Sequence, residues 1–222
     1  MTSRVDLSDV SVSFPDGESR VTAIDHASFE AAAGELAVIR GASGSGKSTL
    51  LNVIAGLQGV DGGRVRVGEV DVATSGEEDL AMMRLTHVGV VFQENNLLPE
   101  FSASENVQLP LRARGWGSTE AMIETNVMME AVGLGTLGRR RPSQLSGGQR
   151  QRVGIARALV GGRNVLVADE PTGALDTTTS HAVFTLLREF SRRGVTVIVA
   201  SHDPEIDVYA DKVVFISDGK VS

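Results

Sequence analysis

Short apolar runs alternate with amphipathic stretches along most of the chain, and this pattern predicts strands separated by helices. Apolar runs bounded by turn residues are typical of buried strands. The predicted buried strands lie at residues 35–41, 88–92, 165–168, 195–200 and 212–217. Helical periodicity follows at 48–57 and 177–193, and a short helix precedes the last strand. Strands that alternate with helices indicate a largely parallel sheet covered on both faces.

The ends of this pattern differ from its centre. Val10, Val12 and Phe14 alternate with serines, as in a half-buried strand, and residues 15–17 read as a turn. Residues 29–33 and 64–67 predict two further strands near the amino terminus. Residues 101–132 have a helical pattern that breaks at 114–117 and contains no predicted strand. We therefore expect one domain over residues 1–222 with a helical subdomain at about 94–160.

Composition and charge exclude several classes of protein. The 222 residues carry a net charge of −7, which argues against nucleic acid as a partner. The sequence contains no cysteine, which rules out disulfides and thiolate metal sites. Residues 1–20 lack a signal-peptide core, and the apolar runs are far shorter than the ~20 residues of a membrane helix. Any contact with a membrane is therefore expected to come through a partner.

A glycine-rich loop follows the predicted strand at 35–41 and precedes a helix. Residues 41–48 fit the pattern G-x-x-x-x-G-K-[ST], in which backbone N–H groups turn around phosphates. The positive end of the following helix dipole points to the same place. Lys47 is expected to neutralise the β- and γ-phosphates, and the Ser48 hydroxyl to bind Mg²⁺.

Two acidic residues end the apolar run at 165–168. Asp169 is expected to bind Mg²⁺, and Glu170 to polarise a water molecule in line with the γ-phosphate. Such a pair alone is also typical of a solvated strand end. Ser146, Gly147, Gly148 and Gln149 begin another helix and form a second candidate anion site; the alternative is an ordinary serine cap.

Taken together, these motifs resemble the ATPases of ABC transporters, over residues 14–219. Gln93 after a strand, Asp176 and residues 201–203 stand in the order and spacing of that family. The resemblance implies an α/β P-loop NTPase fold with a mostly parallel central sheet, an antiparallel β subdomain near the amino terminus and an inserted helical subdomain. It also implies ATP hydrolysis with Mg²⁺, and a homodimer that holds two ATP molecules between phosphate loop and signature helix.

The resemblance assigns roles residue by residue. Glu170, His202, Gln93 and Lys47 are the expected catalytic residues, and Ser48, Gln93 and Asp169 the expected metal ligands. Phe14 is expected to stack on adenine, although a core-facing strand position is the alternative. The implied ATP-binding residues are Phe14, Gly41, Ala42, Ser43, Gly44, Ser45, Gly46, Lys47, Ser48, Thr49, Ser146, Gly147, Gly148, Gln149 and Asp176.

Residues 89–99 and 105–111 are similar to one bacterial branch of the family, which includes lipoprotein-release, macrolide-export, haem-efflux and cell-division ATPases. The resemblance implies a peripheral subunit on the cytoplasmic face of the inner membrane. Its partner would be an integral membrane permease with four membrane helices and a large extracytoplasmic domain, contacted through residues 95–106. The implied cargo is hydrophobic or amphipathic: haem, peptide, lipid, lipoprotein or drug.

Three alternatives compete with a transporter subunit: two are related ATPases, and the third belongs to a different functional class. ATPases of DNA repair or chromosome organisation carry long insertions between the motifs, whereas Lys47 and Ser146 are here a single-domain distance apart. Translation-associated ATPases carry two cassettes, and this sequence has one, with no appended domain expected after residue 219. A regulatory ATPase that gates a permease-like cell-division or signalling complex without transport remains open.

Overall fold

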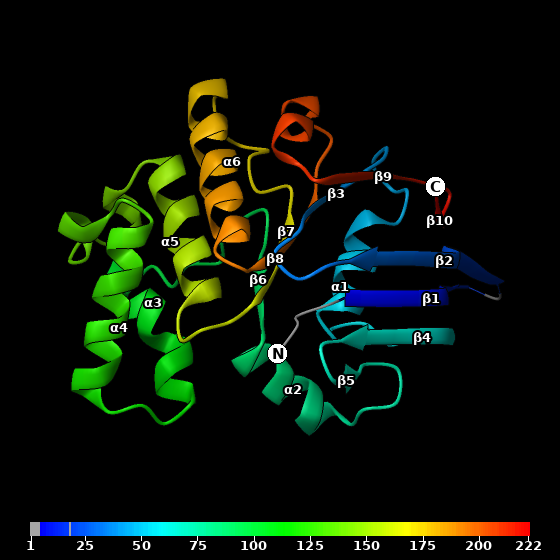
Figure 1. Ribbon diagram of the computed structural model, residues 1–222, viewed down its shortest axis with the longest axis horizontal. Coiled ribbons are helices and arrows are strands. Elements are labelled where there is room, and N and C mark those ends of the chain that lie inside the picture. Colours follow the sequence, from blue (N-terminus) through cyan, green and yellow to red (C-terminus); the bar gives the residue numbers. More distant parts are fainter. Residues whose placement is uncertain (1–4, 18) are drawn as a thin grey trace.

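A twisted sheet of mostly parallel strands lies at the centre of the molecule (Figure 1). The computed structural model describes residues 5–17 and 19–222. Within that part of the chain the strand order is β10-β9-β3-β8-β7-β6, and all neighbours are parallel except β10 and β9. The strands are β3 (Leu36–Arg40), β6 (Val88–Val91), β7 (Val165–Asp169), β8 (Thr196–Ala200), β9 (Lys212–Ser217) and β10 (Lys220–Val221).

A second, antiparallel sheet is built from the amino-terminal part of the chain. Its order is β2-β1-β4-β5, and its strands are β1 (Val5–Asp16), β2 (Ser19–Ala31), β4 (Gly62–Val67) and β5 (Val70–Asp71). Both sheets agree with the predicted fold class. The strand predicted at 29–33 belongs to β2, which begins earlier, at Ser19, and ends at Ala31. Its first part escapes the sequence pattern because His26, with a φ of 50°, shifts the inward-facing alternation between Ile24 and Ala27. The turn expected at 15–17 also starts later, since Asp16 still pairs with Ser19.

Six α-helices occur in the described residues; α1, α2, α5 and α6 contact the parallel sheet, whereas α3 and α4 pack against α5. They are α1 (Lys47–Ile54), α2 (Glu77–Thr86), α3 (Ala103–Ala113), α4 (Ser118–Ala131), α5 (Gly147–Leu159) and α6 (Thr177–Arg192). Short 3₁₀ turns lie at η1 (Gly135–Leu137), η2 (Pro142–Gln144) and η3 (Pro204–Tyr209). Between β6 and β7, where every residue is described, the elements are helical, as the sequence predicts.

Neither α2 nor β5 was expected from the sequence. Met83 is the buried residue of α2, so its apolar periodicity is weak. Among the described residues, none of the helices has the length and apolar character that crossing a membrane requires. The signal-peptide expectation for residues 1–20 falls partly on residues 1–4 and 18, which lie outside the described residues.

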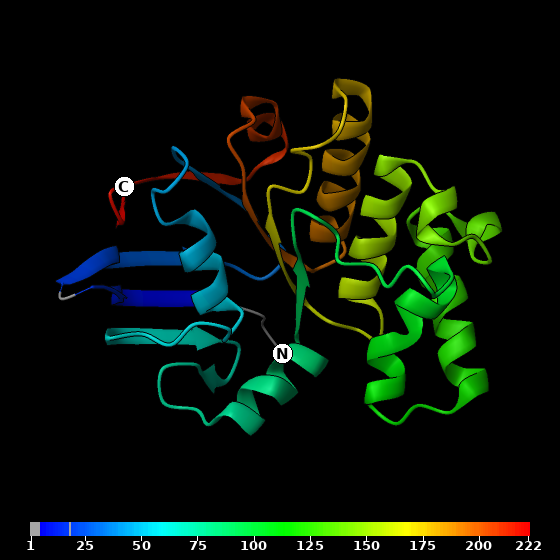
Figure 2. The ribbon, with the colours of Figure 1, turned by 180° about the vertical axis from the view of Figure 1, so that it is seen from behind.

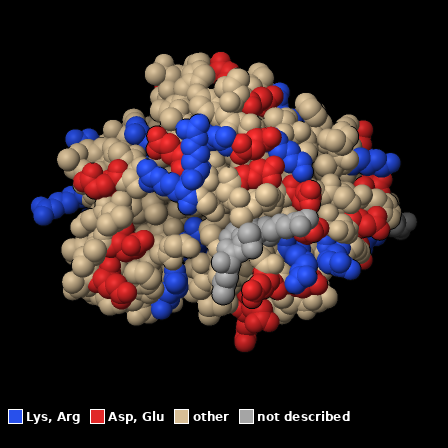
Figure 3. All heavy atoms as spheres, viewed as in Figure 1, with Lys and Arg blue, Asp and Glu red and all other residues tan. Residues whose placement is uncertain are grey.

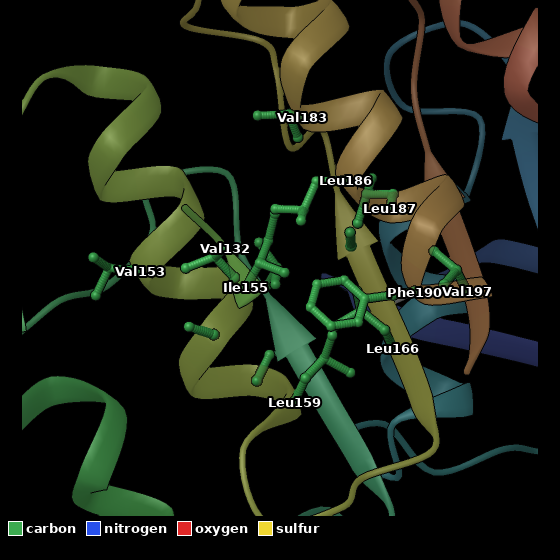
Figure 4. Close-up of a cluster of buried hydrophobic side chains, with 14 of the residues drawn as sticks. Val132, Val153, Ile155, Leu159, Leu166, Val183, Leu186, Leu187, Phe190 and Val197 are labelled. Carbon is green, nitrogen blue, oxygen red and sulfur yellow. The ribbon is translucent and has the colours of Figure 1, made fainter. Parts of the chain in front are cut away.

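Two apolar cores cover the two faces of the parallel sheet. Leu166 and Val197 point to the face that α5 and α6 cover, where they meet Ile155, Leu187 and Phe190 (Figure 4). The alternate residues of the same strands face α1 and the antiparallel sheet. Because side chains alternate along a strand, the continuous apolar runs of β3, β7 and β8 contribute to both cores at once. Figure 2 shows the helical part and the antiparallel sheet at opposite ends of the molecule.

The edge strand β6 lies directly against the backbone of α5. A Cβ atom on Gly89 would be 2.0 Å from the carbonyl oxygen of Ala158, so only glycine permits this approach. The close contact fixes the carboxyl-terminal part of α5 relative to the strand that leads to Gln93.

Candidate functional site

The loop between β3 and α1 has the shape that the phosphate-binding pattern predicts. Gly44 and Gly46 have φ angles of 79° and 109°, in the region that favours glycine. A Cβ atom on Gly46 would lie 2.5 Å from the Ala23 carbonyl oxygen, and one on Gly41 would lie 2.3 Å from that of Ile216. The neighbouring strands β2 and β9 therefore hold the loop from outside. The first N–H groups of α1 remain directed at the space that the loop encloses.

Lys47 lies inside this loop rather than in solvent. Its ammonium group donates hydrogen bonds to the carbonyl oxygens of Gly41 and Ala42, both at 2.8 Å, and the residue is 8% exposed. The buried hydroxyl of Ser45 has no partner among the described residues. A concave cradle with a central cation and unsatisfied donors fits the phosphates of a nucleotide.

A pocket of about 580 Å³ opens above the loop. Its lining residues come from five separate parts of the chain and are Ala23, Gly41, Ala42, Ser43, Gly44, Gly46, Lys47, Ser48, Thr49, Gln93, Glu170 and His202. The structure thus brings together the predicted phosphate loop and the three residues expected to act on the γ-phosphate or the attacking water.

Glu170 and His202 form a hydrogen-bonded pair at one wall of the pocket. Glu170 Oε2 lies 2.8 Å from His202 Nδ1. The carboxylate is mostly buried, with its side chain 15% exposed, whereas the imidazole is 71% exposed. Glu170 has a φ of 45°, which is strained for a residue with a side chain, and its N–H donates to Ala200 O at 2.9 Å. The end of β8 therefore holds the backbone that directs this carboxylate.

The predicted metal ligands lie around the same place but do not all line the pocket. Ser48 and Gln93 do, while Asp169 is the last residue of β7 and stands immediately before Glu170. Hydroxyl, amide and carboxylate oxygens suit Mg²⁺, which takes few protein ligands and completes its shell with water and substrate phosphates. The donor set therefore fits Mg²⁺.

The serine-glycine motif caps α5 at the protein surface. Ser146 is the N-cap: its Oγ accepts a hydrogen bond from the Gln149 N–H at 3.3 Å, and Gln149 Oε1 accepts one from the Ser146 N–H at 3.0 Å. Ser146 is exposed, Gly147 and Gln149 are half-buried, and Gly148 is buried. None of the four lines the phosphate-loop pocket. The capping box confirms that a helix begins here, as the sequence predicts.

Asp176 belongs with this second group. Its side chain caps α6 by accepting hydrogen bonds from the Thr179 N–H at 2.9 Å and the Thr179 hydroxyl at 2.8 Å. These bonds hold the pKa of the Asp176 carboxyl below its usual range. A Cβ atom on Gly148 would lie 2.2 Å from Thr179 Cγ2, and one on Gly147 would lie 3.1 Å from Leu175 Cδ2. The starts of α5 and α6 are therefore packed together.

The predicted site residues thus fall into two groups in one chain. In Figure 1 the loop before α1 and the first turns of α5 and α6 lie toward the same, upper side of the molecule, with both helices to the left of the loop. Acidic and basic side chains are interspersed over the face seen in Figure 3. One chain therefore presents a phosphate cradle and, elsewhere on the same side, a separate helix start.

Two residues near the pocket differ from the sequence-based picture. Phe14 is 38% exposed, so the core-facing alternative is wrong, but it does not line the pocket. It pairs with Val21 at the far part of the hairpin, whereas Ala23 of β2 reaches the pocket. Sequence reasoning missed Ala23 because the first half of β2 was not predicted.

Comparison with known families agrees with this geometry. The family model described as "ABC transporter" matches residues 24–173, which contain the phosphate loop, the serine-glycine motif and Glu170. The chain belongs to the ABC transporter family. It is an ATP-binding cassette of that family, the ATPase domain, which confirms the predicted activity and fold.

Curated relatives are similar over nearly the whole chain. The macrolide export ATP-binding/permease protein MacB of Burkholderia thailandensis is 42% identical over 215 residues, which is 97% of this chain and 33% of the relative. MacB of Escherichia coli strain K12 is 40% identical over 221 residues, which is 100% of this chain and 34% of the relative. The chain spans about a third of the length of the curated relatives it matches. These similarities confirm the predicted branch.

A solved structure is similar over almost its full length. It is the dimeric post-hydrolysis state of the ATP-binding cassette MJ0796 bound to ADP and Pi, with a TM-score of 0.90 and 34% identity over 98% of this chain and 96% of that chain. Another dimeric structure of MJ0796, described as a bacterial ABC transporter cassette, gives the same values.

Proposed function

We propose that this ATPase energises a separate integral membrane permease by closing and opening as an ATP-dependent homodimer. The observation that carries the proposal is the division of its site residues. The phosphate loop, Gln93, Glu170 and His202 share one pocket, while Ser146 to Gln149 lie outside it at the surface. The pocket is therefore complete only when a second chain supplies its serine-glycine helix start.

Substrate ATP would be held mainly through its phosphates. Residues 43, 44 and 46–49 line the cradle, the positive end of the α1 dipole lies there, and Lys47 gives it a full positive charge. The two carbonyl oxygens that now accept from Lys47 keep its ammonium group in place. Bound Mg²⁺ would supply further neutralisation of phosphate charge, with Ser48, Gln93 and Asp169 as the protein groups that would hold it.

Hydrolysis needs a base beside the terminal phosphate. Glu170 is the acid that lines the pocket, and its carboxylate is shielded from bulk water. It would accept a proton from the attacking water while the bond from the γ-phosphorus to the bridging oxygen breaks. Because a carboxylate only accepts hydrogen bonds, Nδ1 of His202 is assigned the proton that bridges to Glu170 Oε2. His202 thereby orients the base.

Dimer closure follows from the position of the second helix start. Ser146 Oγ and the first N–H groups of α5 are near the surface, and Asp176 stands beside them. A neighbour's γ-phosphate would receive these donors and the positive end of the α5 dipole. Hydrolysis and phosphate release remove that bridge and permit reopening, so each turnover produces a mechanical movement. The MJ0796 cassette, at 34% identity, is dimeric with ADP and Pi.

The permease would be of the four-helix type with a large extracytoplasmic domain, and the chain would lie at the cytoplasmic face of the inner membrane. Two observations support this. The MacB relatives are named as macrolide export ATP-binding/permease proteins and are about three times as long. Large apolar side chains are also at least 37% exposed in and next to the predicted contact at 95–106; they are Phe92, Leu98 and Phe101. The cargo is proposed to be hydrophobic or amphipathic.

Replacement of Glu170 by glutamine tests the catalytic assignment. The amide keeps the size of the side chain but cannot take the proton, so kcat should fall about 10²- to 10⁴-fold. The affinity for ATP, measured by equilibrium binding, should stay within about threefold of the parental value, since Lys47 and the loop are unchanged. A Glu170→Gln chain that turns over ATP at the parental rate would show that another group is the base.

A mixing experiment tests the shared site. Lys47→Ala removes the cation of the cradle, and Ser146→Arg blocks the helix start; each chain alone should be inactive. Equal mixing should recover about a quarter of the parental rate, because half of randomly formed dimers are mixed and each has one intact composite site. No recovery at any ratio, with both chains folded, would exclude a site shared between two protomers.

A further inference from the structure

Arg157 connects the last turn of α5 to the segment that follows β6. Its guanidinium donates hydrogen bonds to the carbonyl oxygens of Asn95 at 2.6 Å and Asn96 at 2.7 Å. One turn earlier on the same helix face, Gly154 leaves room for Asn95, whose Oδ1 would be 3.5 Å from a Cβ atom there. Burial lowers the pKa of Arg157, and among the described residues no carboxylate forms an ion pair with it. A desolvated cation is thus satisfied by backbone carbonyls.

These two carbonyl groups belong to the turn that carries Gln93. The Asn95 N–H donates to Phe92 O at 3.0 Å, which closes a four-residue turn with Gln93 and Glu94 at its centre. Asn95 and Asn96 have φ angles of 54° and 46°. Consecutive left-handed residues with side chains are strained and persist only when surrounding contacts hold them. Arg157 supplies two such contacts, so the position of Gln93 depends on it.

Helix α5 therefore has a functional contact at each end. It begins at the cap formed by Ser146, and Arg157 lies in its last turn. The backbone near that end is itself fixed, since Arg163 donates to the carbonyl oxygens of Arg157 at 3.0 Å and Ala158 at 3.3 Å. A displacement of the helix at its start would reach Gln93 through a rigid element about 20 Å long.

We propose that Arg157 is a positioning residue that clamps the turn carrying Gln93 to the signature helix, so that Gln93 is placed correctly only when α5 is. The inference rests on the proposed function, because it concerns how that site is assembled. Arg157 contacts no lining residue of the pocket through the hydrogen bonds described, and it acts through Asn95 and Asn96.

Two substitutions of Arg157 test the clamp. Arg157→Gln should lower kcat about 10- to 100-fold with little change in ATP affinity, since a small displacement of a positioned group has effects of this size. Arg157→Lys should recover part of the rate, because an ammonium group can donate to one carbonyl but lacks the planar fork. Arg114→Gln is the matched control: Arg114 also donates to a backbone carbonyl, that of Gly161, without contacting the turn. Its kcat should remain parental.

Two readouts separate positioning from a general structural role. Amide hydrogen exchange of residues 93–98 should be faster in Arg157→Gln than in Arg114→Gln, while the circular dichroism of both stays parental. In a Gln93→Ala background, Arg157→Gln should add less than a twofold loss of kcat. Parental exchange at 93–98, or a full additional loss without Gln93, would overturn the clamp. An inactive parental chain would instead contradict the proposed function, and the exchange result would still decide the clamp.

Discussion

Gly46 offers a quantitative test of how the phosphate loop is held. Gly44 and Gly46 both have positive φ angles, of 79° and 109°, so alanine is strained at either position by about 1–2 kcal/mol. A Cβ atom at Gly44 meets nothing within 4 Å, whereas one at Gly46 would lie 2.5 Å from Ala23 O and 3.0 Å from Ile24 Cδ1. The contact with backbone adds about 1–3 kcal/mol. We therefore predict losses of about 1–2 kcal/mol for Gly44→Ala and about 2–5 kcal/mol for Gly46→Ala.

Urea unfolding followed by circular dichroism measures this difference, and thermal unfolding should show Tm values separated by roughly 5 °C. Gly44→Ala is the control because it shares the loop and the left-handed backbone but lacks the contact. Two variants of equal stability would refute the reasoning, since Gly46 has the strands β2 and β9 behind it and Gly44 has open space.

Two further predictions concern packing and charge. Leu187→Ala removes a fully buried side chain between α6 and the sheet and should cost about 2–5 kcal/mol in urea unfolding; a loss below 1 kcal/mol would contradict the packed core of Figure 4. The hydrogen bond from Arg188, together with that from the Leu36 N–H, holds the pKa of Asp211 below its ordinary 3.8. A carboxyl group whose pKa is lower in the folded than in the unfolded state stabilises the fold at pH values above its unfolded-state pKa. This stabilisation is lost as the pH falls through the folded-state pKa. Asp211→Asn should therefore lower the free energy of unfolding by about 1 kcal/mol at pH 7, a modest loss because solvent screens the partly exposed Arg188–Asp211 pair. The difference in stability between the variant and the parental protein should shrink below about pH 4. A gap that widens with acid would contradict this sign.

The sequence was sufficient for the parallel sheet because strands buried on both faces are continuous apolar runs. β3, β7 and β8 begin and end within one residue of the predicted positions. The phosphate loop and the α5 cap were also predictable, since each follows from local backbone chemistry over a few residues. Where local pattern determines structure, the prediction holds.

The remaining features depend on contacts between distant parts of the chain. The left-handed backbone conformation of His26 interrupts the alternation of inward-facing residues in β2. The sequence pattern therefore does not reveal that β2 extends to Ala23, which lines the pocket. Helix α2 buries few side chains, so its sequence shows only a weak apolar periodicity. The Glu170–His202 pair joins residues 32 positions apart, and Arg157 reaches carbonyls about 60 positions away. No property of an arginine in a helix indicates that a distant turn depends on it.

The central claim is that nucleotide is held between two copies of this chain, and the mass of the Glu170→Gln variant in solution tests it most directly. Light scattering should give a monomer without nucleotide and a dimer with Mg²⁺ and ATP. Addition of Ser146→Arg to the same chain should restore the monomer while ATP binding persists. A variant that binds ATP with parental affinity yet stays monomeric, or a dimer that forms equally well with Ser146→Arg, would contradict the account.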